Sequence, residues 1–131
     1  MDKIFNSEFL DAMFAQAAEN PRKRINHDLR NSAADTSQRM LNALLPETVV
    51  PIHRHEDTAE TVICLSGRLI EVIYDEVSGE NGEKSYREQS RTLLCPAEGC
   101  HGMQVPAGAW HNIEVLEPSV IFEAKDGAYR G

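Results

Sequence analysis

The sequence predicts an all-β domain, a small barrel or two-sheet jelly roll, with one N-terminal helix. Two observations predict it: beyond residue 21, short segments alternate apolar and polar residues, and turn residues separate these segments at short intervals. A helical period occurs only near the start of the chain. Many short strands joined by turns, with a single helix, are typical of small barrels and jelly rolls.

The helix is expected within residues 1–21. Ser7 is its candidate N-cap, and Pro21 ends it. Its apolar stripe must cover the barrel or a partner subunit, so residues 1–21 are assigned to the helix and residues 22–131 to the barrel domain. The residues of the stripe are Leu10, Met13, Phe14 and Ala17.

Eight or more short strands are expected in the barrel domain, several of them predicted by alternation and one, at 39–45, also compatible with a short helix. The cluster at 78–82 contains Asn81-Gly82, which favours a hairpin turn between two strands. The clearest strand candidates are residues 22–29, 39–45, 68–75, 86–94, 111–116 and 119–125.

The segment that begins at His53 has the residues of a metal site. His53 and His55 are separated by one residue, so both side chains of an extended chain point the same way. After a polar turn, Glu60 opens the next strand and can bring a carboxylate beside the two imidazoles. Downstream, a Pro-x-Gly turn sets His111 at the start of another strand, which completes three nitrogens and one oxygen.

The spacing of His53, His55, Glu60 and Gly67 resembles the first motif of the cupin superfamily at every position. This resemblance implies a cupin barrel, also called a double-stranded β-helix, and it makes residues 22–131 a cupin domain. It also favours a strand at 39–45, because the order of strands in a cupin requires one there.

The second motif of that superfamily is matched at Pro106, Gly108 and His111. Cys100 stands where its leading glycine would be, and Val115 stands where its terminal asparagine would be. The metal ligands implied by the resemblance are therefore present, although two other positions of the second motif differ.

Three further segments resemble the WbuC-type cupin fold metalloproteins, which are often encoded among genes for surface polysaccharide synthesis. They are residues 25–29, 38–44 and 122–129. Members of that family often extend further at the C-terminus than Gly131, so a closing segment is expected to be missing.

The expected cofactor is a divalent first-row transition metal, because imidazole and carboxylate ligands suit Zn, Fe, Mn, Ni and Cu alike. Four protein ligands leave an octahedral metal with open positions for water or substrate. The alternative is a closed structural tetrahedron around zinc, made by the same four residues.

The resemblance implies action on a small molecule, a sugar or nucleotide sugar of polysaccharide biosynthesis, with the metal polarising a substrate oxygen. Isomerase, epimerase and oxygenase chemistry all stay open. The candidates for acid, base or anion-positioning work are His27, Tyr74 and Arg39. Tyr74 is included because alternation can turn it inward, and His27 because the pKa of a free imidazole lies near neutrality. For His27, a half-buried, hydrogen-bonded structural histidine is the alternative.

A non-catalytic module that binds or senses a small ligand at the metal is the second hypothesis. Ile113 and Val115 share the face of His111 and would make the cavity apolar. Trp110 is expected to face away from the ligands and to serve in packing or an interface. A metal-free epimerase is disfavoured, because converging histidines and a glutamate without a cation would leave buried polar groups unsatisfied.

The composition limits the classes of partner that the protein is expected to bind. A net charge of -8, from 21 acidic and 13 basic residues, repels nucleic acid and anionic lipid surfaces. No apolar run approaches the roughly 20 residues of a membrane span. The three cysteines have no C-x-x-C spacing, the start of the chain has no secretory pattern, and we expect a cytoplasmic protein in which Cys64 is a core residue. A homodimer is the default assembly.

Overall fold

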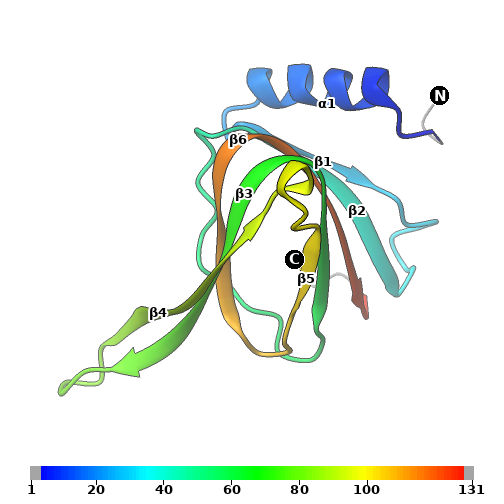
Figure 1. Cartoon of the computed structure of the whole chain (residues 1–131). Helices are drawn as coiled ribbons and strands as arrows, with labels where there is room; N and C mark the ends of the chain where they lie inside the picture. Colours follow the sequence, from blue (N-terminus) through cyan, green and yellow to red (C-terminus); the bar gives the residue numbers. More distant parts are fainter. Residues whose placement is uncertain (1–3, 129–131) are drawn as a thin grey trace.

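The computed structural model describes residues 4–128, and it confirms an all-β fold with one helix (Figure 1). The last residue of the 122–129 segment, Tyr129, lies outside the described residues. No helix within residues 4–128 is both long and apolar enough to cross a bilayer. The elements are α1 (Ser7–Glu19), β1 (Arg24–Asp28), β2 (Ser37–Leu44), β3 (Glu60–Ser78), β4 (Lys84–Leu94), the 3₁₀ turn η1 (Pro96–Glu98), β5 (Gly102–Val105) and β6 (Trp110–Asp126).

One antiparallel sheet forms the body of the molecule. Its strand order is β1-β2-β6-β3-β4, and β5 pairs with β3 beside this path. The sheet curves around an interior, with α1 lying across the outside over β1 and β2 (Figure 1).

The helix begins one residue earlier than the predicted Ser7 cap requires. Asn6 is the N-cap, and its side-chain oxygen accepts a hydrogen bond from the backbone N–H of Phe9 at 2.9 Å, whereas Ser7 is already helical. Asparagine caps a helix as well as serine does, so the pattern alone does not separate two adjacent candidates.

The apolar side of α1 packs on the outer face of the sheet. Met13 and Ala17 are buried against Leu41 and Ala43 of β2 and Val120 of β6. Each large apolar side chain buried in this way contributes about 1.5–3 kcal/mol. The stripe is thus covered within the same chain.

A second core fills the inside of the curved sheet, with contributions from every strand except β1. Cys64 belongs to it and is 3% exposed, which confirms its prediction as a core residue. The buried members are Leu44, Val62, Cys64, Leu69, Leu94, Val105, Val115 and Ile121.

The prediction of eight or more short strands is wrong, because residues 4–128 contain six strands and two of them are long. The pairing of β3 with β6 shifts register on both sides of Gly67 without ending either strand. Gly67 has a φ of 102°, and a Cβ there would collide with the Pro118 carbonyl and with Ser119. Bulges of this kind bend a strand sharply and let it continue around the barrel.

Candidate metal centre

The two histidines of the His-x-His segment lie on the loop between β2 and β3, not on a regular strand as expected. His53 forms a single bridge with His111: the N–H of His53 donates to the carbonyl of His111 at 3.0 Å, and the reverse bond measures 2.8 Å. The N–H of Gly108 donates to the carbonyl of His55 at 2.8 Å. Pro51 has no N–H and a bend follows His55, so only this short stretch is held against β6.

Backbone carbonyls fix the rings of two histidines. Nδ1 of His53 lies 2.8 Å from the carbonyl oxygen of Pro51, and Nδ1 of His111 lies 2.9 Å from that of Ala109. A carbonyl only accepts, so each Nδ1 carries the hydrogen, and Nε2 of the neutral ring presents a lone pair. Burial lowers the pKa of His111, which favours this neutral form.

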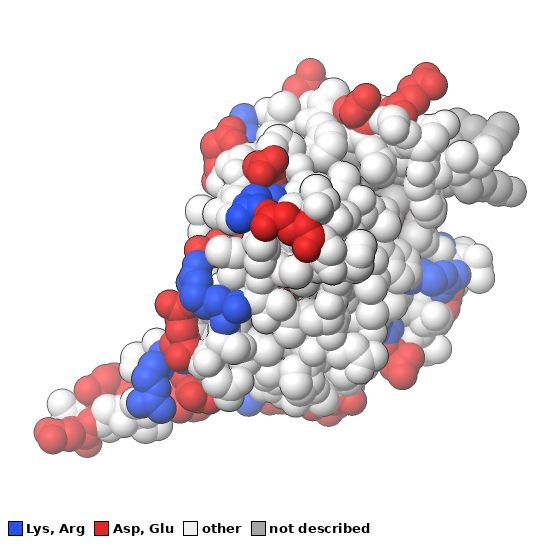
Figure 2. Space-filling view, in the orientation of Figure 1, with Lys and Arg blue, Asp and Glu red and all other residues white. Residues whose placement is uncertain are grey.

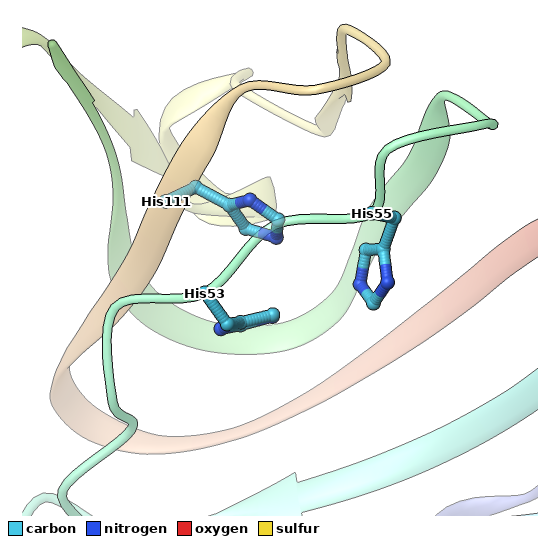
Figure 3. Close-up of side chains that lie close together, drawn as sticks. All are labelled: His53, His55 and His111. Carbon is cyan, nitrogen blue, oxygen red and sulfur yellow. The ribbon is translucent and has the colours of Figure 1, made fainter. Parts of the chain in front are cut away.

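The three imidazoles converge on one space (Figure 3). One nitrogen of each of His53, His55 and His111 lies within 4.8 Å of the others. Nε2 of His55 and Nε2 of His111 are buried and have no hydrogen-bond partner among the described residues. Buried polar atoms nearly always have a hydrogen-bond or metal partner, so these two nitrogens indicate a site for a bound partner such as a metal ion.

Glu60 meets this group from the start of β3. Its side chain is 4% exposed, and Oε2 lies 3.0 Å from Nε2 of His55 and 3.5 Å from Nζ of Lys125. Burial alone would raise its pKa, but the contact with His55 and the charge of Lys125 outweigh burial and hold the pKa at about 2. Glu60 is therefore an ionised carboxylate beside the histidines.

Two more carboxyl groups lie inside the barrel. Glu71 on β3 is 1% exposed, and neither of its oxygens has a hydrogen-bond partner within residues 4–128. Burial, followed by the charges of Glu60 and Glu123, raises its pKa to about 9. Burial and Glu60 likewise raise the pKa of Glu123 to about 8, and Glu123 accepts a hydrogen bond from Asn42 at 2.7 Å. Both groups are thus neutral at pH 7.

The sequence prediction did not include Glu71 or Glu123 in the site. A signal existed for Glu71, since it alternates in register with Leu69 and Ile73, two residues of the barrel interior or its margin. A carboxyl group in an apolar register is unusual and marks a position of interest. Glu123 has no comparable signal, because its neighbour Glu60 comes from a different strand.

The three residues predicted for acid, base or anion-positioning work lie elsewhere. His27 packs edge-on against Phe9 of α1, with ring centroids 5.1 Å apart. Arg39 lies on the side of β2 that faces α1 and pairs with Asp35 at 3.1 Å. The hydroxyl of Tyr74 donates to a side-chain amide of β6 at 2.7 Å, on the outer face of the sheet. The structure brings the three histidines together and places Glu60 beside His55, and it does not bring His27, Arg39 or Tyr74 to them.

A cavity of about 880 Å³ opens beside the histidines. His53, His55 and Lys125 line it, together with Arg54 and Trp110. The Arg54 guanidinium lies 4.5 Å from the centre of the Trp110 ring, so Trp110 reaches the cavity although it was expected to face away. A small molecule in this cavity would touch both the histidine group and the two cations.

The expectation that Ile113 and Val115 line the cavity is wrong. Val115 is buried in the inner core and Ile113 packs against that core, further along β6 than His111. Sharing a face of β6 with His111 therefore does not place a residue at the cavity.

The residues present fit a divalent first-row transition metal. Three imidazole nitrogens, two of them held by hydrogen bonds at the opposite ring nitrogen, and one ionised carboxylate are ligands that Zn, Fe, Mn and Ni accept. A cation would also supply partners for the unpaired atoms of His55, His111 and Glu60.

A family model described as "Domain of unknown function (DUF6016)" matches residues 5–85. No curated protein matches the chain.

Solved structures show what the chain resembles in fold. KdgF from Halomonas sp. has a TM-score of 0.60 at 14% identity, over 85% of this chain and 84% of that one. TT1209 from Thermus thermophilus has a TM-score of 0.60 at 23% identity, over 95% and 97%. Oxalate decarboxylase from Bacillus subtilis, with Mn(II) centres, has a TM-score of 0.56 at 16% identity, and the match covers 82% of this chain and 26% of that one. KdgF and oxalate decarboxylase are cupins, so this chain has the cupin fold.

Proposed function

The chain belongs to the family described as Domain of unknown function (DUF6016), and we propose that it is a metal-binding cupin that acts on a small molecule. The ligands are His53, His55, His111 and Glu60. The observation that carries this proposal is the set of buried, unpartnered ligand atoms: Nε2 of His55, Nε2 of His111 and Oε2 of Glu60.

The contact between His55 and Glu60 does not satisfy all of these atoms. Nε2 of His55 and Oε2 of Glu60 lie 3.0 Å apart, but Nε2 of His111 has no hydrogen-bond partner among the described residues. A metal ion would be a partner for all three atoms. Leaving them unsatisfied would cost each group its hydration without compensation.

A bound divalent transition metal supplies a Lewis acid that polarises a substrate oxygen. Manganese is one candidate, since the Bacillus subtilis oxalate decarboxylase has Mn(II) centres; zinc, iron and nickel suit the same ligands. The chain itself binds and orients the small molecule. Lys125 and Arg54 line the cavity together with Glu56, Asp57 and Asp126, so the lining offers polar contacts of both signs to the ligand. Glu60 stays ionised beside His55.

The finer part of the proposal concerns substrate and setting. Residues that resemble the WbuC-type cupins favour a sugar or nucleotide sugar of surface polysaccharide biosynthesis. The negative net charge disfavours nucleic-acid partners, and the cysteines, which have no C-x-x-C spacing, favour a cytoplasmic protein. A homodimer is the commonest closed assembly. A cavity of about 880 Å³ is large enough for a carbohydrate-sized ligand.

Metal content of the purified protein tests the proposal. We expect about one transition metal per chain by elemental analysis, and lower occupancy in His53→Ala and His111→Ala, because losing one strong ligand weakens such a site sharply. His101→Ala is the matched control, since His101 is exposed. Full occupancy in a triple alanine variant of His53, His55 and His111 would refute the assignment.

A non-catalytic module that binds or senses a small ligand is the second candidate. One observation favours it: His27, Tyr74 and Arg39, the residues suggested for acid, base or anion-positioning work, do not line the cavity. Turnover assays with nucleotide sugars on the metal-loaded protein separate the two. Binding without product formation across such a panel selects the module, and product formation selects the enzyme.

A further inference from the structure

The second half of β3 and the first half of β4 form a two-stranded arm that projects from the barrel (Figure 1). Residues 84–91 of β4 are exposed without interruption, on both faces of the ribbon. Tyr86 is 39% exposed within this stretch. Figure 2 shows acidic and basic side chains interspersed along the arm.

This arm has little packing beyond its own two strands, apart from the ring of Tyr86, whose centroid lies 5.1 Å from that of Trp110 on β6. A two-stranded hairpin is marginally stable in water unless a third strand or another surface packs on it. Within the described residues, β4 pairs with β3 alone, so its other edge presents unpaired N–H and C=O groups. Such an edge is a template for another strand.

We propose that this edge is the surface that joins two copies of the chain, with β4 pairing antiparallel to β4 of the partner subunit around a two-fold axis at Tyr86. The interface supplies the surface for the homodimer included in the proposed function. It extends the sheet of one subunit into the other and gives each arm a third strand.

The charges of β4 select this register. With Tyr86 opposite Tyr86 of the partner subunit, Lys84 lies opposite Glu88 of the partner subunit, and the symmetry repeats that pair on the other side of the axis. Unlike charges directly opposite each other stabilise a sheet, and so do aromatic pairs. Lys84, Tyr86 and Glu88 alternate along β4, so all of these side chains share one face.

Three registers with the axis further along β4 are less favourable. An axis at Arg87 places two arginines opposite each other, and an axis at Glu88 does the same with two glutamates. An axis at Gln89 puts Arg87 opposite Arg91. Like charges directly opposite are destabilising, so the sequence of β4 opposes these alternatives.

A charge swap tests the interface. Sedimentation equilibrium over a concentration series measures the dimer constant of the wild-type protein, K84E, E88K and the double variant K84E/E88K. Each single variant places like charges opposite each other at both ends of the interface and is expected to weaken the dimer by about tenfold. The double variant restores unlike pairs with reversed polarity and is expected to recover the wild-type constant.

Changes within one subunit cannot mimic this rescue. Lys84 lies 3.5 Å from Glu76 and Glu88 pairs with Arg91, and the double variant disrupts both of these contacts. Hydrogen exchange adds a second measurement, since the β4 amides on the edge away from β3 become protected only as the dimer forms. A chain that stays monomeric at the highest attainable concentration overturns the proposal. So does a dimer that is indifferent to the swaps, with these outer-edge amides unprotected. Metal content, measured on the same samples, tests the metal centre separately.

Discussion

Replacing Glu71 with glutamine should make the metal-free protein more stable at neutral pH. Glu71 is 1% exposed, both of its oxygens are unpartnered, and its pKa is raised from 4.5 to about 9. The unfolded chain releases this proton near pH 4.5, whereas the folded chain keeps it. The folded state is therefore favoured fully below pH 4.5, and this contribution is lost as pH rises toward 9.

The size of the effect follows from linkage. Each pH unit over which only the unfolded chain has lost the proton costs the folded state about 1.36 kcal/mol. Between about pH 5 and about pH 7 this amounts to about 2.5 kcal/mol in the free energy of unfolding. Glutamine cannot ionise and is close to a protonated carboxyl group in shape, so the E71Q variant lacks this loss.

Urea unfolding of chelator-treated protein at both pH values measures the effect. The stability advantage of E71Q over wild type should grow by about 2.5 kcal/mol from pH 5 to pH 7, and constant costs of the substitution cancel in this difference. Glu80→Gln, on an exposed residue of the hairpin turn, is the control and should show no such growth. An advantage of E71Q that does not change with pH would refute a neutral, buried Glu71.

Three further predictions concern the metal, the bend of β3 and the helix cap. Metal should be retained above neutral pH and released progressively as pH falls below about 6.5, followed by elemental analysis after dialysis, because imidazole must be neutral to bind; unchanged occupancy at pH 4 would contradict histidine ligation. Gly67→Ala should lower the free energy of unfolding by at least about 2 kcal/mol, since its φ of 102° and the neighbouring Ser119 leave no room for a Cβ; wild-type stability in urea would show that the bend relaxes. Asn6→Ala should cost about 1 kcal/mol through loss of the bond to Phe9, whereas Ser7→Ala should cost little, and the reverse order in thermal melts would make Ser7 the cap.

The fold could be predicted because its signals are local. Alternation and turn residues indicate strands whatever their partners are, and the single helical period near Met13 indicates the one helix. The number of strands could not be predicted in the same way. Gly67 and Pro118 look like strand ends in sequence, yet each lies in a bulge through which the strand continues, and only the pairing of β3 with β6 shows this.

In the candidate site, too, local features could be predicted from the sequence and long-range features could not. Motif spacing predicts that His53, His55 and His111 meet, and in the structure one nitrogen of each lies within 4.8 Å of the others. The raised pKa values of Glu71 and Glu123 arise from burial and from neighbouring carboxyl groups that are distant in sequence, so the sequence does not predict these values. For Glu71, only its position in an apolar register is visible in the sequence. His27 was a candidate because the pKa of a free imidazole lies near neutrality. A catalytic residue must also lie at the cavity, and this depends on the topology of the fold.

The anomalous difference map of crystals of the purified protein, recorded at transition-metal absorption edges, tests the central claim most directly. It should show one metal bonded to nitrogens of His53, His55 and His111 and to an oxygen of Glu60, with at least one further position, facing the cavity, held by a non-protein ligand. The account would be contradicted by crystals with no anomalous peak at the histidines, or by a metal closed by protein ligands alone with the cavity filled by side chains.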